Sequence, residues 1–289
     1  MQHHGEHPSS GADNLMTAKW LSFVTAVLLS GCASLPNTQT GNLDHRTVEY
    51  ALSQHNTIPV VFESPLGGSL RWWDKVYSAI ANDSTVFAYS RAGYGQSEPV
   101  SSPRDGHHIV EELRAVLHEK GLHPPYVLVG HSLGGLYMQL FARQHPEDVA
   151  ALVLVDSTGP ARFKGKPMRE HWPWWWRVLF GLFAPTIAQQ ELDELDVTGE
   201  QVMTLPTLTE KPVIILSAND WVNDKTEEMP DFIEYHKDFV RLYPGCTHLW
   251  VESGHDIPHD NPDAVIAAIR DVLARVSPFT HVMIKGGDS

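Results

Sequence analysis

The sequence is poor in several features that mark particular classes of protein. It has only two cysteines, Cys32 and Cys246, so at most one disulfide is possible within the chain. The sequence before Cys32 indicates a different role for that cysteine. Basic residues are scarce: 21 Lys and Arg against 35 Asp and Glu give a formal net charge of -14. This balance argues against a nucleic-acid partner, because phosphates demand basic patches. The sequence contains no Gly-Lys-Ser/Thr, no His-Glu-x-x-His and no cysteine cluster, so no phosphate-binding loop, metal or organic cofactor is implied.

An apolar run near the N-terminus is too short to span a bilayer as a helix. It covers the eleven residues 20–30, follows Lys19 and ends at small residues before Cys32. A basic start, a short apolar core and small residues at the end are typical of a secretory signal. The ending Leu29-Ser-Gly-Cys32 resembles the lipobox of bacterial lipoproteins, which implies that Cys32 is lipidated and becomes the mature N-terminus. An ordinary secretory signal cleaved nearby and a buried core helix are the alternatives.

This interpretation divides the chain into three parts. Residues 1–31 are an N-terminal extension and signal peptide, with translation starting at Met1 or Met16. Residues 32–45 are the anchor cysteine and a polar linker, and residues 46–289 are one folded domain. Because Ala33 is not the aspartate associated with retention in the inner membrane, the resemblance favours the periplasmic side of the outer membrane. Membrane attachment is then expected through Cys32.

The pattern of apolar runs within the domain predicts an α/β fold. Short buried strands alternate with amphipathic helices, and this rhythm is typical of a mainly parallel sheet flanked by helices. The first two strands are expected to pair with each other, and a helix is expected to open at Ser102-Pro103. The expected strands cover residues 47–52, 58–62, 85–89, 126–129, 149–155 and 212–217.

The most informative motif is Gly130-His-Ser132-Leu-Gly134, which lies between a predicted strand and a predicted helix. So tight a turn strains the serine backbone and holds its hydroxyl at the end of the sheet, and only small residues fit two positions away on either side. Together with Gly135, the motif resembles the nucleophile elbow of the α/β-hydrolase superfamily. The resemblance implies an α/β-hydrolase fold in which Ser132 is the catalytic nucleophile.

The same resemblance implies an oxyanion hole made of two backbone N–H groups. One donor is expected at Leu133, directly after the nucleophile, and the other at Leu66 in the loop Glu63 to Gly68. Relatives usually carry glycine where this chain has Pro65, which has no N–H and a fixed φ. The alternative for this loop is a plain turn.

A histidine and a carboxylate complete the site that the resemblance implies. His255 lies in Ser-Gly-His-Asp, between a short strand and a helix that opens at Asn261-Pro262, as in the histidine loop of the superfamily. Asp220 follows the strand after which the superfamily commonly places its acid. Asp156, at the end of the preceding strand, is the main rival, and Asp224 is a third candidate.

A tryptophan-rich segment interrupts the strand and helix rhythm at about residues 157–210. In the superfamily an insertion here forms a cap, so a small helical cap over the site is expected. The tryptophans could pack the cap, line an apolar substrate pocket or touch a membrane interface.

The sequence therefore predicts a serine hydrolase that cleaves an acyl bond of a small-molecule substrate, by default a carboxylic ester, through an acyl-enzyme. Serine at the elbow argues against the dehalogenases and epoxide hydrolases of the superfamily, which place aspartate there. The alternatives are an apolar-ligand-binding protein on the same scaffold and an α/β-hydrolase peptidase. The oligomeric state is left open.

Overall fold

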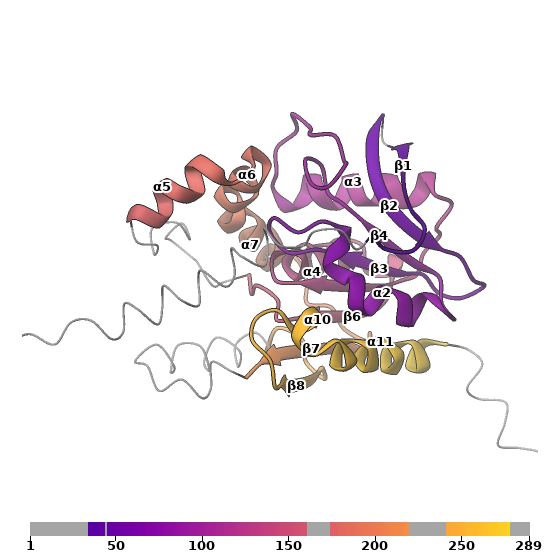
Figure 1. Ribbon diagram of the computed structural model, residues 1–289. Coiled ribbons are helices and arrows are strands. Elements are labelled where there is room, and N and C mark those ends of the chain that lie inside the picture. The colour runs from indigo at the N-terminus through magenta and orange to yellow at the C-terminus, as the bar shows by residue number, and fades with distance from the viewer. Residues whose placement is uncertain (1–33, 44, 161–173, 220–240, 278–289) are drawn as a thin grey trace, which may run out of the picture. The chain divides into compact units, whose positions relative to one another are not determined.

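The computed structural model describes residues 34–43, 45–160, 174–219 and 241–277 (Figure 1). Contacts divide the chain into two units, residues 1–33 and 34–289, and the description that follows concerns the second unit. Cys32, Asp220 and Asp224 therefore lie outside the described residues. Within the described ranges, no helix combines the length and the apolarity that crossing a membrane requires.

The described residues form one sheet of eight strands in the order β1-β2-β4-β3-β5-β6-β7-β8. β2 runs antiparallel to both of its neighbours, β1 and β4, and all other neighbouring strands are parallel. The sheet is thus mainly parallel, as expected. The strands are β1 (Thr38–Leu43), β2 (Arg46–Ser53), β3 (Val60–Glu63), β4 (Val86–Tyr89), β5 (Tyr126–His131), β6 (Val149–Val155), β7 (Val213–Ala218) and β8 (Thr247–Val251).

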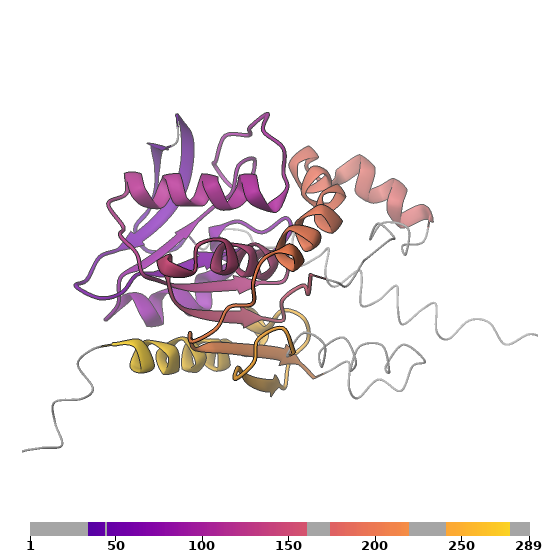
Figure 2. The same ribbon diagram turned by 180° about the vertical axis from the view of Figure 1, so that it is seen from behind.

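Helices cover both faces of the sheet. One face packs against α2 and α11, and the other packs against α3 and α4, while α5, α6 and α7 belong to the insertion (Figures 1 and 2). The helices are η1 (Leu70–Trp73), α2 (Asp74–Ala81), α3 (Gly106–Glu119), α4 (Leu133–Gln144), η2 (Pro146–Asp148), α5 (Trp174–Phe183), α6 (Thr186–Asp193), α7 (Leu195–Thr204), α10 (Ile257–Asp260) and α11 (Pro262–Val276).

The central strand β5 shows why apolar runs without alternation become parallel strands here. Its side chains point to opposite faces in turn, so Val127 and Val129 join the core under α2 and α11 while Leu128 joins the core under α3 and α4. All three are fully buried. A strand covered on both faces needs apolar residues at every position, which is what the sequence supplies.

Two expectations about the N-terminal part do not hold. Residues 38–43 form β1, paired with β2, where a polar linker was expected over 34–45. The two strands expected as a pair are not neighbours, because β4 lies between β2 and β3. The polar residues of β1 join the sheet through backbone pairing with β2 and need no apolar side chains. Hydrophobic periodicity therefore does not predict this strand.

The helix expected to open at Ser102-Pro103, with Pro103 as its first residue, begins three residues later, at Gly106. Asp105 is the N-cap and accepts a hydrogen bond from the His107 N–H at 3.0 Å. The Ser102 hydroxyl donates instead to Glu112 within the helix, at 2.9 Å. An aspartate that reaches an amide of the first turn therefore replaces the expected capping box.

Candidate active site

Three side chains from distant parts of the chain meet at the carboxyl end of the parallel strands. Ser132 follows β5, Asp156 follows β6, and His255 lies in the loop between β8 and α10 (Figure 1). In open α/β sheets this edge is where ligands bind, because the loops that leave the strands converge there. The strand order brings these three loops together, since β5, β6, β7 and β8 are successive neighbours.

Ser132 has a strained backbone, as the elbow motif predicts. Its φ of 53° and ψ of -122° are rare for a residue with a side chain. A Cβ at Gly130 would lie 2.6 Å from the carbonyl oxygen of Gly134, and one at Gly134 or Gly135 would run into neighbouring atoms just as closely. Close approach of the backbone therefore requires Gly130 and Gly134, and the Ser157 side chain requires Gly135. Ser132 N donates to the Val155 carbonyl at 3.1 Å, which fixes the turn.

A continuous line of hydrogen-bonding distances joins serine, histidine and carboxylate. The Ser132 Oγ lies 3.0 Å from His255 Nε2, and His255 Nδ1 lies 2.6 Å from Asp156 Oδ2. The Asp156 side chain is 7% exposed and that of His255 is 30% exposed, so the carboxylate is shielded while the imidazole reaches the open side. The carboxylate beside the histidine is thus the rival candidate Asp156. The first choice, Asp220, lies outside the described residues.

Asp156 is held in this position by the neighbouring strand β7. Its second carboxylate oxygen accepts a hydrogen bond from the Ala218 N–H at 3.0 Å, and its own N–H donates to the Leu216 carbonyl at 2.8 Å. Its φ of 37° turns the chain sharply as it leaves β6. These contacts aim Oδ2 at the imidazole, which fixes Nδ1 as the protonated nitrogen, so Nε2 can accept a proton from Ser132 Oγ.

His131, within the elbow, supports the loop that carries the histidine. Its ring is fully buried, and its Nε2 lies 2.8 Å from the His255 carbonyl, so Nε2 donates. The ring also stacks on Trp72, with centroids 5.8 Å apart. Burial, together with the nearby His255, lowers the pKa of His131 to about 4, so the ring stays neutral near pH 7. His131 therefore has a structural role.

The loop expected to supply an oxyanion donor is a tight turn beside the elbow. Gly68 N donates to the Pro65 carbonyl at 3.1 Å, and Gly67 has a φ of 76°, which places Leu66 and Gly67 at the two central positions. Pro65 fits as the first residue of this turn because it contributes only its carbonyl. The Glu63 end of the loop lies against Gly134 of the elbow, and Leu133 is the first residue of α4, where amides have no intrahelical acceptor.

A buried arginine joins this loop to the cap. Arg91 Nη1 donates to Glu63 at 2.6 Å and Nη2 donates to Glu191 of α6 at 2.9 Å, and the three side chains are at most 1% exposed. The guanidinium also donates to the carbonyls of Ser64 and Pro65, at 2.6 and 3.0 Å. Burial raises the pKa of Glu63, whereas Arg91 acts in the opposite direction. No local sequence pattern marks this network, because its partners lie far apart in the chain.

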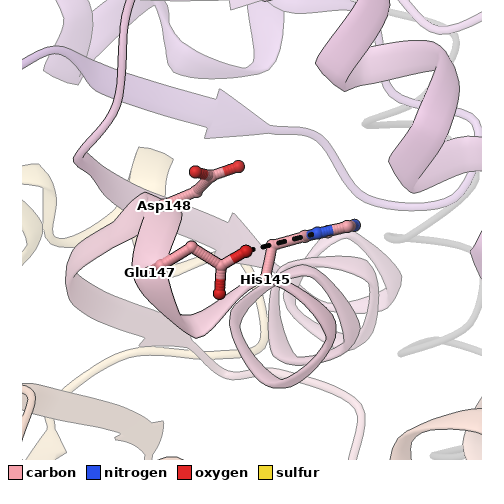
Figure 3. A group of neighbouring side chains, drawn as sticks. All are labelled: His145, Glu147 and Asp148. Atoms are coloured by element: carbon pink, nitrogen blue, oxygen red, sulfur yellow. Dashed lines mark ion pairs between the residues drawn. The ribbon is translucent and has the colours of Figure 1, made fainter.

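A second cluster of polar side chains lies at the opposite edge of the sheet. Figure 3 shows His145, Glu147 and Asp148, whose possible ligand atoms lie within 4.8 Å of one another, at the turn that leads into β6. His145 Nε2 already lies 2.9 Å from Glu111, and Asp148 lies 3.2 Å from Arg114. Ion pairing between neighbouring surface side chains accounts for this cluster, which is remote from Ser132.

A mainly parallel sheet with a serine elbow, a histidine and a carboxylate at its carboxyl edge defines the α/β-hydrolase class of enzymes. The family model described as alpha/beta hydrolase fold matches residues 58–195. This range contains β3 to β6, the elbow and part of the cap. The chain has the α/β-hydrolase fold and resembles the α/β-hydrolase superfamily, and its relatives include hydrolases.

The relatives differ in how much of the chain they share. The uncharacterized protein YqjL of Bacillus subtilis is 28% identical over 220 residues, which cover 74% of this chain and 83% of that protein. The putative carbamate hydrolase RutD of Pseudomonas savastanoi pv. phaseolicola is 36% identical over 107 residues, 36% of this chain and 40% of that protein. Among solved structures, a putative lipase of Acinetobacter baumannii AYE superposes with a TM-score of 0.60 at 17% identity, covering 94% of this chain and 99% of that one. This last likeness shows the fold.

Proposed function

We propose that the protein is a serine hydrolase that cleaves an acyl bond, with a carboxylic ester as the default substrate. The observation that carries this proposal is the pair of distances from Ser132 Oγ to His255 Nε2, 3.0 Å, and from His255 Nδ1 to Asp156, 2.6 Å. A serine within reach of a general base, itself oriented by a buried carboxylate, is the arrangement that nucleophilic acyl transfer requires. The hydrolases among the relatives support the same class of reaction.

In the proposed reaction Ser132 attacks the acyl carbon while His255 takes the hydroxyl proton. His255 then gives that proton to the leaving group, and the acyl group stays on Ser132. Water, deprotonated by His255, releases the acid in the second half of the cycle. Asp156 stabilises the imidazolium and holds it in one orientation, which is the role sequence analysis first gave to Asp220.

We propose Leu133 and Leu66 as the sources of the two oxyanion N–H donors. Leu133 is the first residue of α4, so its amide belongs to the helix N-terminus, where negative charge is favoured. Leu66 lies in the turn that Arg91 holds through the carbonyls on its N-terminal side. Each such donor contributes about 3 to 4 kcal/mol to stabilising the transition state.

The test is turnover of p-nitrophenyl esters of increasing acyl length by the full chain and by Ser132→Ala. The proposal expects hydrolysis that the substitution abolishes, and the chain-length profile then defines the acyl pocket. An intact, folded protein that turns over no ester, thioester or amide would instead favour the ligand-binding alternative.

We further propose that Cys32 carries a lipid that attaches the protein to the periplasmic side of a bacterial outer membrane. The lipobox-like sequence before Cys32 supports this. The start of the folded unit also supports it, because that unit begins at Ser34, two residues after Cys32, and Leu35 is already buried at 2% exposure. Metabolic labelling with a fatty acid, compared between the full chain and Cys32→Ser, tests the proposal.

A further inference from the structure

The cap carries an exposed apolar helix that the proposed chemistry does not use. In α5, the side chains of Trp174, Leu182 and Phe183 are 71%, 71% and 79% exposed, and those of Val178 and Leu179 are 52% and 40% exposed. Figure 2 shows α5 continuing outward from α6 at the edge of the described fold. Contiguous exposed apolar residues of this size mark an interaction site in soluble domains.

The exposed side chains share one side of the helix. At about 100° per residue, the five positions fall within roughly half of the circumference, and Phe180 falls in the other half. Among the described side chains of α5, Phe180 is the partly buried one, and it packs against the cluster of Tyr94, Ile187 and Ala188. The helix is thus attached to the cap along one side and presents an apolar half to its surroundings. A Cβ added at Gly181 would have no neighbour within 4 Å, consistent with this orientation.

The charge around α5 differs from that of the rest of the chain. Residues 171–190 contain no Asp or Glu, although the whole sequence has 35 in 289 residues. Arg177, which is exposed, lies just outside the apolar half of the helix. The protein is strongly acidic, yet the segment around this tryptophan-rich apolar helix has no acidic residue and includes an arginine. Such a composition is typical of a helix that lies in the membrane interface.

We propose that the apolar half of α5 docks into the interface of a lipid bilayer and brings the active site to acyl substrates held in that bilayer. The second part rests on the proposed hydrolase function, whereas docking itself does not. Leu66 of the proposed oxyanion loop packs against the same cluster as Phe180, so the helix and the loop are joined through shared neighbours. The proposed lipid on Cys32 would supply one membrane contact, and α5 would supply a second that orients the domain.

The experiment measures binding to vesicles without the lipid anchor. The parent is the full chain with Cys32→Ser, mixed with vesicles of phosphatidylcholine and phosphatidylglycerol and assayed by co-sedimentation. The test variant adds Leu182→Asp and Phe183→Asp. The matched control adds Val197→Asp and Met203→Asp on α7, which are 43% and 46% exposed and introduce the same charge. All three proteins keep residues 20–30, so differences between them report on the substituted helix.

The proposal expects at least about a tenfold weaker vesicle association for the α5 variant than for the parent, because burial of each apolar side chain favours binding by roughly that factor. The control should stay within about twofold of the parent. Equal binding by the parent and the α5 variant, equal losses in both variants, or an α5-dependent dimer without vesicle binding would overturn it. Turnover of a soluble ester by the same three proteins separates the two proposals. Loss of docking with unchanged turnover in the α5 variant bears only on the docking proposal. Docking without any turnover in the parent would refute the proposed hydrolase activity.

Discussion

Replacing the carboxylate beside His255 distinguishes the two aspartates that the sequence left in competition. In Asp156→Asn the amide oxygen can still accept from the Ala218 N–H, so the turn after β6 keeps its anchor. The other position would face His255 Nδ1 with an NH2 group in place of an acceptor. The imidazole would then adopt the wrong tautomer, with Nε2 protonated and unable to take the proton from Ser132.

The expected magnitude is large because the effect falls on the proton transfer itself. Loss of the acid with the geometry preserved lowers kcat by about 10⁴ in a Ser-His-Asp triad, which corresponds to about 5.5 kcal/mol in the barrier. KM should change little, since Asp156 is 8% exposed and does not line an open surface. The assay is ester hydrolysis by the full chain, with Asp220→Asn as the matched control. A large loss in Asp220→Asn together with near-normal activity in Asp156→Asn would refute the assignment.

Three further predictions concern the supports of the site. Gly134→Ala should lower both the melting temperature and kcat, because its Cβ would collide with the backbone of Glu63, and unchanged values would contradict the close packing. Glu191→Gln should cost roughly 3 kcal/mol of stability in denaturant unfolding, because Arg91 loses a buried charged partner, and a cost below about 1 kcal/mol would argue against the network. Burial lowers the pKa of His131 to about 4 in the folded state, against about 6.5 in the unfolded state. Between these two pH values the unfolded state binds more protons, so the free energy of unfolding should fall by about 3 kcal/mol as the pH drops through this window. His131→Gln should remove that part of the pH dependence, and an unaltered profile would count against a neutral buried ring.

The features predicted correctly from sequence are those whose physical cause is local. The elbow consists of a strand, a tight turn and a helix in immediate succession. The spacing of Gly130, Ser132 and Gly134 is therefore enough to predict it. The helix that opens at Asn261-Pro262 is equally local, since the asparagine side chain caps the Ala264 N–H at 3.3 Å. The prediction of His255 rests on its place between such elements.

The features that the sequence left open or did not indicate depend on which strands become neighbours. Asp156 meets His255 across 99 residues, and nothing in the spacing of Asp156 or Asp220 says which carboxylate reaches the ring. The link from Arg91 to Glu191 spans 100 residues and joins the core to the cap. Such contacts follow from the order of strands and the placement of the insertion, and neither leaves a periodic signal in the sequence.

A loop after β4 depends on a similar long-range contact. The Ser90 hydroxyl, directly after this strand, donates to Glu49 of β2 at 2.7 Å. Glu49 also accepts from the Gln96 N–H at 3.1 Å, so a carboxylate from another strand holds the glycine-containing loop. The partner that holds this loop lies in β2, a strand whose pairing with β4 was not predicted from the sequence.

The central claim is that Ser132 is a nucleophile activated by His255. Its most direct test is reaction of the full chain with a fluorophosphonate, followed by mass spectrometry of the labelled peptide. The account predicts one adduct on Ser132, formed rapidly by the parent and at least about 10³-fold more slowly by His255→Ala. A folded protein that gives no adduct on Ser132, or that labels equally fast without the histidine, would contradict it.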